Sequence, residues 1–141
     1  MAEPDPTPKL LDQLVHRGEP GNAALSADGR TLTYADLDRE VTEAANRLCA
    51  LGMRPGDRVA SWMGKTVLAC ILPLACARAQ LVHVPVNPVL KRAQVAHILH
   101  DSGARLLIGN AARLQSLESA DRGEAELVEL EAWADLKQRP F

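Results

Sequence analysis

From residue 58 onward, short apolar runs alternate with stretches of helical periodicity. The expected strands begin near Arg58, Leu81, Arg105 and Glu126. These starts are separated by 23, 24 and 21 residues, and each interval has room for a strand, a turn, a helix and a second turn, as a crossover between parallel strands requires. The helical stretches cover residues 66–79, 90–102 and 111–117. The pattern predicts an α/β fold with a mainly parallel sheet and helices on both faces.

The expected strands are apolar along nearly their whole length. The runs at 59–60, 81–84 and 106–108 contain a single polar residue, His83. Such runs are typical of strands that are covered on both faces, because a strand with one solvated face alternates apolar and polar residues. We therefore expect helices to cover both faces of these strands.

A short helix is expected near the N-terminus. Leu10, Leu11, Leu14 and Val15 recur at helical spacing, and a glycine and a proline at positions 18 and 20 end the pattern. Residues 1–8 are too polar and proline-rich to fold alone, so a flexible tail is expected ahead of a single domain at 9–141. The length of 141 residues fits one such domain.

A β-hairpin and a long helix are expected next. Extended segments at 23–26 and 31–33 flank Asp28-Gly29, a pair that supplies the positive backbone angles of a tight hairpin turn. Thr33 then fits the start of a helix, because its hydroxyl can accept the backbone N–H of Asp36. This helix is expected to bury the stripe formed by Leu37, Val41, Ala44, Ala45 and Leu48, and to end at Gly52.

Composition and charge exclude several classes of protein. The formal net charge of −2 gives no electrostatic basis for binding nucleic acid. The longest uncharged run in the middle, 66–77, is too short to span a bilayer, so no transmembrane segment is expected. The acidic N-terminus lacks the pattern of a secretory signal. Three cysteines, Cys49, Cys70 and Cys76, form no CxxC pair, which indicates a reduced, cytoplasmic chain with thiols packed as small apolar groups.

Gly64-Lys65-Thr66 has the composition of the end of a phosphate-binding loop. It follows an expected strand and precedes an expected helix. A true phosphate loop also needs a glycine five residues earlier, so that backbone N–H groups can surround the phosphates. That position is Val59, inside a strand. We therefore interpret these residues as a helix start with an exposed lysine.

The histidines give no metal site. His97 and His100 lie three residues apart on an expected helix next to Asp101, and a pair at this spacing holds zinc only when a third ligand converges on it. The apolar positions of that helix place at least one of the two in solvent. His83 is expected to be a histidine of the core or the sheet end, with one ring nitrogen hydrogen-bonded.

Other reactive residue types have structural interpretations. Ser61 and Ser102 have no histidine and acid at a recognisable spacing, so neither is assigned as a nucleophile. Pro73 lies inside the most apolar helix, where packing can tolerate a kink. An acidic stretch near the end of the chain is interpreted as the solvated face of a last strand; its members are Glu124, Glu126, Glu129 and Glu131.

Five segments together resemble the opening of the AMP-forming adenylating enzymes, the superfamily of acyl-CoA synthetases, luciferases and peptide-synthetase adenylation domains. They are LTYADLD at 32–38, ANRL at 45–48, GMRPGDRVA at 52–60, VPVNP at 84–88 and ILHDSGARLLI at 98–108. Their order and spacing fit across about residues 10 to 110. Residues 84–107 also resemble acyl-CoA ligases associated with exosortase systems.

The resemblance implies the N-terminal lobe of an enzyme that activates a carboxylate. Such an enzyme uses ATP and Mg to form an acyl-adenylate and pyrophosphate, and then transfers the acyl group to coenzyme A. The family's phosphate loop, ribose-binding acid and catalytic lysine lie beyond the matched region, so no catalytic, cofactor-binding or metal residue is assigned to this chain. We expect an N-terminal fragment that is inactive alone.

Two loops depart from the pattern of that family. Family members commonly carry Lys-Ala-Gly before the second parallel strand, where this chain has Arg78-Ala79-Gln80. Gly64-Lys65-Thr66 replaces the usual Pro-Asn-Ser after the first parallel strand. Both departures lie in loops, so the expected fold is unchanged.

The resemblance also implies a partner for the chain. An N-terminal lobe alone leaves apolar surface without its cover, so the expected partner is the remainder of the enzyme or a second copy of the chain. Two other classes remain open, a stand-alone interaction module with the same fold and an independent nucleotide binder. The second of these needs a glycine-rich turn after a strand, which Gly64-Lys65-Thr66 does not provide.

Overall fold

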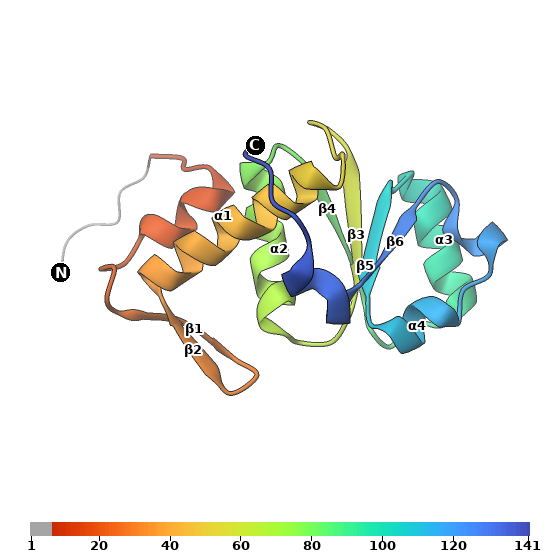
Figure 1. Cartoon of the computed structure of the whole chain (residues 1–141), viewed down its shortest axis with the longest axis horizontal. Helices are drawn as coiled ribbons and strands as arrows, with labels where there is room; N and C mark the ends of the chain where they lie inside the picture. The colour runs from red at the N-terminus through yellow and green to blue at the C-terminus, as the bar shows by residue number, and fades with distance from the viewer. Residues whose placement is uncertain (1–6) are drawn as a thin grey trace.

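The fold is a four-stranded parallel sheet between two helical layers, with a separate two-stranded hairpin (Figure 1). A computed structural model describes residues 7–141. The strands are β1 Ala23–Ala27, β2 Arg30–Thr33, β3 Arg58–Trp62, β4 Val82–Val86, β5 Leu106–Gly109 and β6 Glu126–Glu129. The α-helices are α1 Tyr34–Ala50, α2 Val67–Arg78, α3 Arg92–Ser102 and α4 Ala111–Gln115. The 3-10 helices are η1 Leu11–His16, η2 Ser119–Arg122 and η3 Leu130–Asp135.

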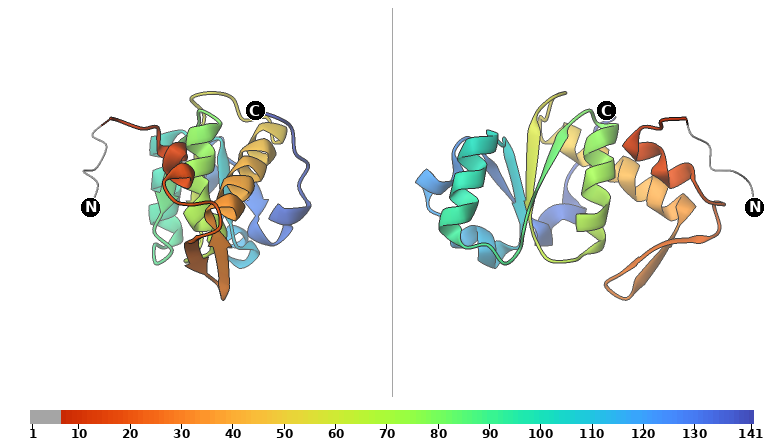
Figure 2. Two further views of the ribbon diagram at one scale, coloured as in Figure 1. Left: turned by 90° about the vertical axis from the view of Figure 1, so that its left-hand side faces the viewer. Right: turned by 180° about the vertical axis from the view of Figure 1, so that it is seen from behind.

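The strand order of the sheet is β4-β3-β5-β6, and all three pairings are parallel. The chain passes from β3 to β4 on one side and then crosses back over β3 to reach β5. Because crossovers between parallel strands are right-handed, this reversal places α2 on one face of the sheet and α3 with α4 on the other (Figures 1 and 2). The predicted α/β fold with a parallel sheet and helices on both faces is confirmed.

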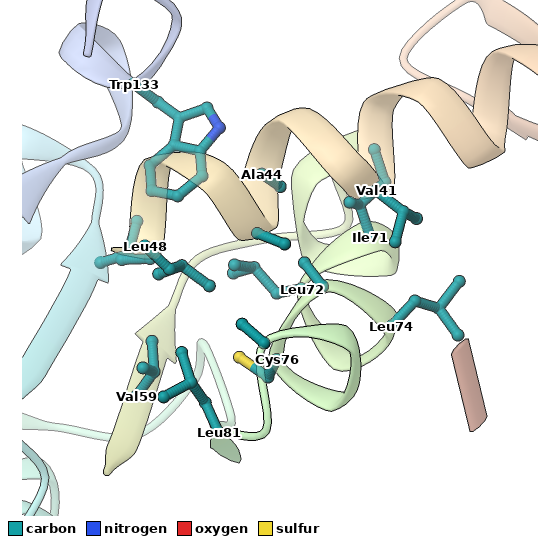
Figure 3. Packing of buried hydrophobic residues seen from close by; sticks show 14 of the residues in the cluster. Val41, Ala44, Leu48, Val59, Ile71, Leu72, Leu74, Cys76, Leu81 and Trp133 are labelled. Carbon is teal, nitrogen blue, oxygen red and sulfur yellow. The ribbon is translucent and has the colours of Figure 1, made fainter. Parts of the chain in front are cut away.

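The larger core lies between the sheet, α2 and α1. Figure 3 shows Val59 of β3 facing Leu72 of α2, with Leu48 of α1 and Trp133 of η3 closing the same cluster. Val59, Leu72 and Leu48 have no exposed surface. Burying each such side chain stabilises the fold by about 1.5–3 kcal/mol relative to leaving it exposed. Trp133 therefore joins the last 3-10 helix of the chain to its first long helix.

A smaller core fills the opposite face of the sheet. Leu107 of β5 and Trp62 of β3 meet Val95 and Leu99 of α3 there. Successive side chains of a strand point to opposite faces, so neighbouring residues of β5 serve the two cores in turn: Leu106 and Ile108 join the larger one and Leu107 the smaller. The continuous apolar run in this strand was correctly interpreted as burial on both faces.

β4 differs from the sequence-based expectation. It lies at the edge of the sheet, and Val82 is 46% exposed. The reversal of strand order explains this, because α2 and α3 pack over the sheet centre and leave its edge partly open. The N–H of Val82 donates to the carbonyl of Asp57 in the neighbouring chain segment. Backbone N–H groups point alternately to the two sides of a strand, so the nitrogen of Pro85, three residues on, points to the open edge. Because proline has no N–H, this edge is disfavoured for pairing with a further strand.

The N-terminal helix is a 3-10 helix, and its apolar face is different from the predicted one. Leu10, Leu11 and Leu14 are exposed, whereas Asp12 and Val15 are buried. Residues three apart share a face in a 3-10 helix, so Asp12 and Val15 both face the protein. Of the predicted tail at 1–8, residues 1–6 lie outside the described part of the chain.

A buried ion pair explains why Asp12 faces inward. The guanidinium of Arg78, at the end of α2, donates to the carboxylate of Asp12 at 3.3 Å and to that of Asp38 at 2.8 Å. It also donates to the hydroxyl of Thr42 at 2.8 Å. The Arg78 side chain is only 9% exposed. One side chain thus joins η1, α1 and α2.

The hairpin and the start of α1 match the sequence-based prediction. β1 and β2 are antiparallel around Asp28 and Gly29, whose φ angles are +54° and +69°. The hydroxyl of Thr33 accepts the N–H of Asp36, and the Asp36 carboxylate accepts the N–H of Thr33. The backbone N–H and the hydroxyl of Thr33 both donate to the Asp36 carboxylate and lower the pKa of that carboxyl. The reciprocal pair satisfies two N–H groups that a helix start leaves open.

α2 ends in a backbone conformation that favours glycine. Its last turn passes through Ala79 to Gln80, which has a φ of +59°. The N–H of Gln80 donates to the carbonyl of Ala77, and its own carbonyl accepts the N–H of Gly56. The family pattern places glycine at this position, and the positive φ gives the physical reason. Upstream, α2 is continuous through Pro73.

Replacing Gln80 with glycine is expected to stabilise the chain. Glycine at position 80 keeps the left-handed conformation without the strain, which costs a non-glycine residue about 1 kcal/mol. The greater freedom of glycine in the unfolded chain offsets part of this gain in stability. We expect a net gain of about 0.5 kcal/mol in the free energy of unfolding, measured by urea denaturation. Ala77→Gly, inside the helix, should instead lose about 1 kcal/mol. Equal losses from both substitutions would contradict the strain at Gln80.

Removing the charge of Arg78 is expected to destabilise the chain strongly. Arg78→Met leaves the carboxylate of Asp12 buried without its partner, and breaking such a pair costs about 3 kcal/mol. Arg39→Met is a matched control, because Arg39 makes only exposed ion pairs with Asp36 and Glu43, worth under about 1 kcal/mol. Urea denaturation measures both. Similar losses for the two variants would show that the Arg78 network contributes little.

Candidate functional site

The carboxyl ends of the parallel strands define the region where a ligand would bind. In open α/β sheets, ligands bind outside these ends, at the point where neighbouring strands send their helices to opposite faces. Here that point lies between β3, which continues into α2, and β5, which continues into α4. A phosphate at this point would be bound by the backbone N–H groups at the starts of α2 and α4.

A carboxylate of the chain occupies the start of α2. The backbone N–H of Val67 donates to the carboxylate of Asp28, from the hairpin turn, at 3.0 Å. The hydroxyl of Thr66 accepts the N–H of Ala69 at 3.1 Å, and Lys65 is exposed. Two acceptors from the protein already satisfy N–H groups that a phosphate would use. Gly64-Lys65-Thr66 is thus a capped helix start with an exposed lysine.

The start of α4 is closed in the same way. Both carboxylate oxygens of Glu131 accept the N–H of Ala111, at 3.0 and 3.3 Å. The neighbouring Gly109 has no free space either: a Cβ there would lie 2.8 Å from the carbonyl oxygen of Trp62 and 3.0 Å from the Leu114 side chain. The switch point therefore has no opening for an anion, which argues against an independent nucleotide binder.

A cationic groove lies beside this closed point, on the α3 side. It has a volume of about 670 Å³, and the residues used here to define it are Trp62, Val89, Lys91, Arg92, Arg113 and Ser116. All its charged lining residues are cations. Arg92 is paired with Glu118 at 2.8 Å and Asp121 at 2.6 Å. The backbone N–H of Glu118, which donates to the Asp121 carboxylate, and the Arg92 guanidinium lower the pKa of that carboxyl. Arg113 donates to the side-chain oxygen of Asn110.

Trp62, which lines this groove, also carries a buried unsatisfied donor. Its side chain is at the end of β3 and only 4% exposed, and its indole N–H has no hydrogen-bond partner within residues 7–141. Leaving such a buried donor unpaired costs about 1–3 kcal/mol. Lys91 and Arg113, which have no ion pair with an acidic residue among residues 7–141, favour a ligand with negatively charged oxygens. Sequence inspection missed this groove because its charged residues come from separate loops.

The structure brings together Ser61 and His83, which the sequence did not link. The Ser61 hydroxyl and the His83 Nε2 are 2.9 Å apart, across β3 and β4. Burial lowers the pKa of His83, so the ring is neutral at pH 7. His83 thus has the hydrogen-bonded ring nitrogen expected of a sheet histidine. Val59 lies opposite His83 in the parallel register. Ser61 follows Val59 by two residues, so its side chain lies on the same face of the sheet as that of His83.

The remaining candidates have structural roles. His97 and His100 are both exposed, and His100 Nε2 donates to the carbonyl of Ala120 at 2.7 Å. Residues 7–141 contain no group of three histidine, cysteine or acidic side chains arranged to hold a metal. The Ser102 hydroxyl accepts the N–H of Ala104 at the end of α3. Asp101 is exposed and lies outside any such cluster.

The cysteines and the acidic stretch are divided between core and surface. Cys49 and Cys76 are buried, and burial raises the pKa of the Cys76 thiol to about 12. Cys70 is exposed, so its expected place in the core is wrong: it lies near the start of α2 and lines an open hollow with Ser61 and His83. All four residues of the acidic stretch are exposed as predicted, but Glu124 and Glu131 lie outside β6, so they do not form one face of the last strand. Among the described helices, none combines the length and apolarity needed to cross a membrane.

Comparisons with known proteins find a ligase and a CoA synthase among the relatives of the chain. Over 89 residues it is 45% identical to a fatty acid–[acyl-carrier-protein] ligase of Streptomyces coeruleorubidus, covering 63% of this chain and 17% of that protein. Over 93 residues it is 45% identical to a feruloyl-CoA synthase of Amycolatopsis, covering 65% of this chain and 19% of that protein. The chain thus spans less than a fifth of these relatives.

A solved structure and a family model give the same assignment. The N-terminal domain of FACL13 from Mycobacterium tuberculosis superposes with a TM-score of 0.73 at 27% identity, over 80% of this chain and 31% of that one. The model of the AMP-binding enzyme family matches residues 13–139. The fold also resembles that of the N-terminal subdomain of NpsA from Klebsiella oxytoca, with a TM-score of 0.80 at 24% identity over 94% of this chain and 34% of that one. The chain belongs to the AMP-binding enzyme family.

Proposed function

We propose that the chain forms the N-terminal part of an ATP-dependent, AMP-forming acyl-CoA ligase. The parent enzyme would join a carboxylate to AMP with release of pyrophosphate and then transfer the acyl group to coenzyme A. The family match over 13–139 carries this proposal. The similarity to ligases and CoA synthases supports it. The exosortase-associated subfamily and a cytoplasmic location stay predictions from the sequence.

The described residues fit ATP and Mg poorly. The starts of α2 and α4 carry the carboxylates of Asp28 and Glu131, which would repel phosphates. No three side chains among residues 7–141 gather as a metal site. We therefore derive no adenylation step for this chain and propose that it is inactive alone. Its part in the parent enzyme is to supply the sheet and its grooves.

Coenzyme A fits the cationic groove better. Lys91 and Arg113 supply positive charge, whereas Arg92 is paired with Glu118 and Asp121, and the apolar Val89 lies in the same lining. Coenzyme A combines phosphates with a long, weakly charged arm that ends in the reactive thiol. We propose that this groove holds the phosphate-bearing end, while the chemistry takes place on other parts of the parent enzyme.

The remainder of the parent enzyme is the proposed partner of the chain. Val82 on the edge strand β4 keeps 46% of its surface exposed, and apolar edge surface of this kind is typically covered in a larger assembly. The alternative is a stand-alone interaction module with the same fold. Such a module would not need to bind coenzyme A, so it gives no reason for the cationic groove.

The mass of the native protein and its catalytic activity test the proposed function. An antibody to residues 33–57 should detect a species several times heavier than 15.2 kDa in the source cells. That species should catalyse exchange of pyrophosphate into ATP with a suitable carboxylate, whereas the 141-residue chain should not. A native species of 15.2 kDa that neither exchanges pyrophosphate nor binds coenzyme A would favour the interaction module.

Arg113→Gln is expected to weaken the binding of coenzyme A to the chain. One partly exposed ion pair is worth up to about 1 kcal/mol, so the dissociation constant from calorimetry should rise about threefold to fivefold. Arg54→Gln is the matched control, because Arg54 is exposed in the turn before β3 and lies outside the groove. High salt should reduce the difference between Arg113→Gln and the unmodified chain. Equal effects of the two substitutions would exclude the groove as the phosphate site.

A further inference from the structure

Exposed leucines gather at the N-terminal 3-10 helix. Six large apolar side chains are exposed in the described part of the chain, and three of them, Leu10, Leu11 and Leu14, lie on or next to η1. Their exposed fractions are 74%, 55% and 52%. Single exposed leucines are common on protein surfaces, whereas a contiguous group of them marks a contact site. Together with Lys9 and Arg17, which line the same hollow, they form what we call the leucine patch.

The Arg78 ion pair explains why the apolar side of η1 faces outward. Asp12 is the one acidic residue of η1, and its carboxylate is turned inward to the guanidinium of Arg78. Because residues three apart share a face in a 3-10 helix, Val15 turns inward with Asp12. Leu11 and Leu14 are also three apart and share the outer side. The ion pair thus holds the leucines in water and keeps the acidic group away from them.

The charges beside the leucines are positive. Lys9 and Arg17 are exposed, and no aspartate or glutamate lines the hollow that they share with the three leucines. The hollow has a volume of about 240 Å³, which is below the range of small-molecule sites. An apolar patch bordered by cations instead fits a surface that is apolar inside and negatively charged outside, as a layer of anionic lipid is.

The position of η1 lets a flat surface reach the leucine patch. η1 packs on α1 and α2, and Figures 1 and 2 show it near one end of the longest axis, away from the sheet. A bilayer requires only apolar side chains that are exposed at such an end. A protein partner would also require a complementary shape. The observations therefore favour lipid over protein as the occupant of the patch.

We propose that the leucine patch binds the surface of an anionic lipid bilayer, with the leucines entering the interface and Lys9 and Arg17 meeting the lipid phosphates. The chain lies on the bilayer without crossing it, and the small contact makes the binding reversible. The net charge of −2 gives the whole chain no general attraction to an anionic bilayer, so binding depends on this patch. The proposal is independent of the ligase reaction, because it uses no residue of the cationic groove.

Substitution of one exposed leucine tests the apolar contact. Leu10→Gln should lower the partition coefficient for vesicles of phosphatidylcholine and phosphatidylglycerol about fivefold to tenfold, measured by flotation. Val89→Gln is the matched control, because Val89 is 72% exposed and lies outside the patch, and it should bind as the unmodified chain does. Thermal unfolding verifies that both variants are folded. Equal binding of the two variants, or no binding of the unmodified chain, would overturn the proposal.

The lipid head group and the native protein test the charges and the occupant. Arg17→Gln should lower binding to the anionic vesicles about threefold to fivefold, less so at high salt, and should have no effect with phosphatidylcholine alone. Arg54→Gln, exposed in the turn before β3, should match the unmodified chain throughout; equal losses for the two arginine variants would contradict the proposed phosphate contact. The native species from the source cells, whatever its mass, should also bind the anionic vesicles. A native species that does not bind would show that another part of the protein covers the patch, and would overturn the proposal.

Discussion

The structure depends on the double-sided burial of its two central strands. β3 and β5 place apolar side chains on both faces of the sheet, as Val59 and Ala60 do from neighbouring positions. Such strands are stable only when a helical layer covers each face. The reversal of direction after β4 meets this constraint, because right-handed crossovers that run in opposite directions along the sheet place their helices on opposite faces. The two cores lie on opposite faces of the sheet because of that reversal.

The same reversal creates a ligand site and then closes it. In an open sheet the switch point is the usual place for a phosphate, but here Asp28 and Glu131 bring carboxylates to the two helix starts beside it. What remains beside it is the groove lined by Lys91, Arg92 and Arg113 on the α3 side. The chain therefore presents binding surfaces without a catalytic centre of its own, as a part of a larger enzyme would.

Local signals made most of the fold predictable from the sequence. The spacing of apolar runs predicted the four parallel strands, and the Thr33 capping box and the Asp28-Gly29 turn were predicted from short patterns. The misplaced features depend on contacts between distant residues. Asp12 faces inward because Arg78, 66 positions away, binds it. The partial exposure of β4 depends on strand order, which periodicity does not specify. The meeting of Ser61 and His83 depends on strand register in the same way.

The position of Trp133 has a consequence for how the domain forms during synthesis. This side chain packs on α1 (Figure 3), the N–H of Arg139 donates to the carbonyl of Asn46, and Arg47 donates to the carbonyl of Ala134. The contact between Arg47 and Ala134 spans 87 positions. Because translation adds residues from the N-terminus, α1 leaves the ribosome long before the segment that covers it. The smaller core draws on residues 60–125 and can assemble first, whereas the larger one stays incomplete, and exposed to chaperones, until the segment that carries Trp133 has emerged.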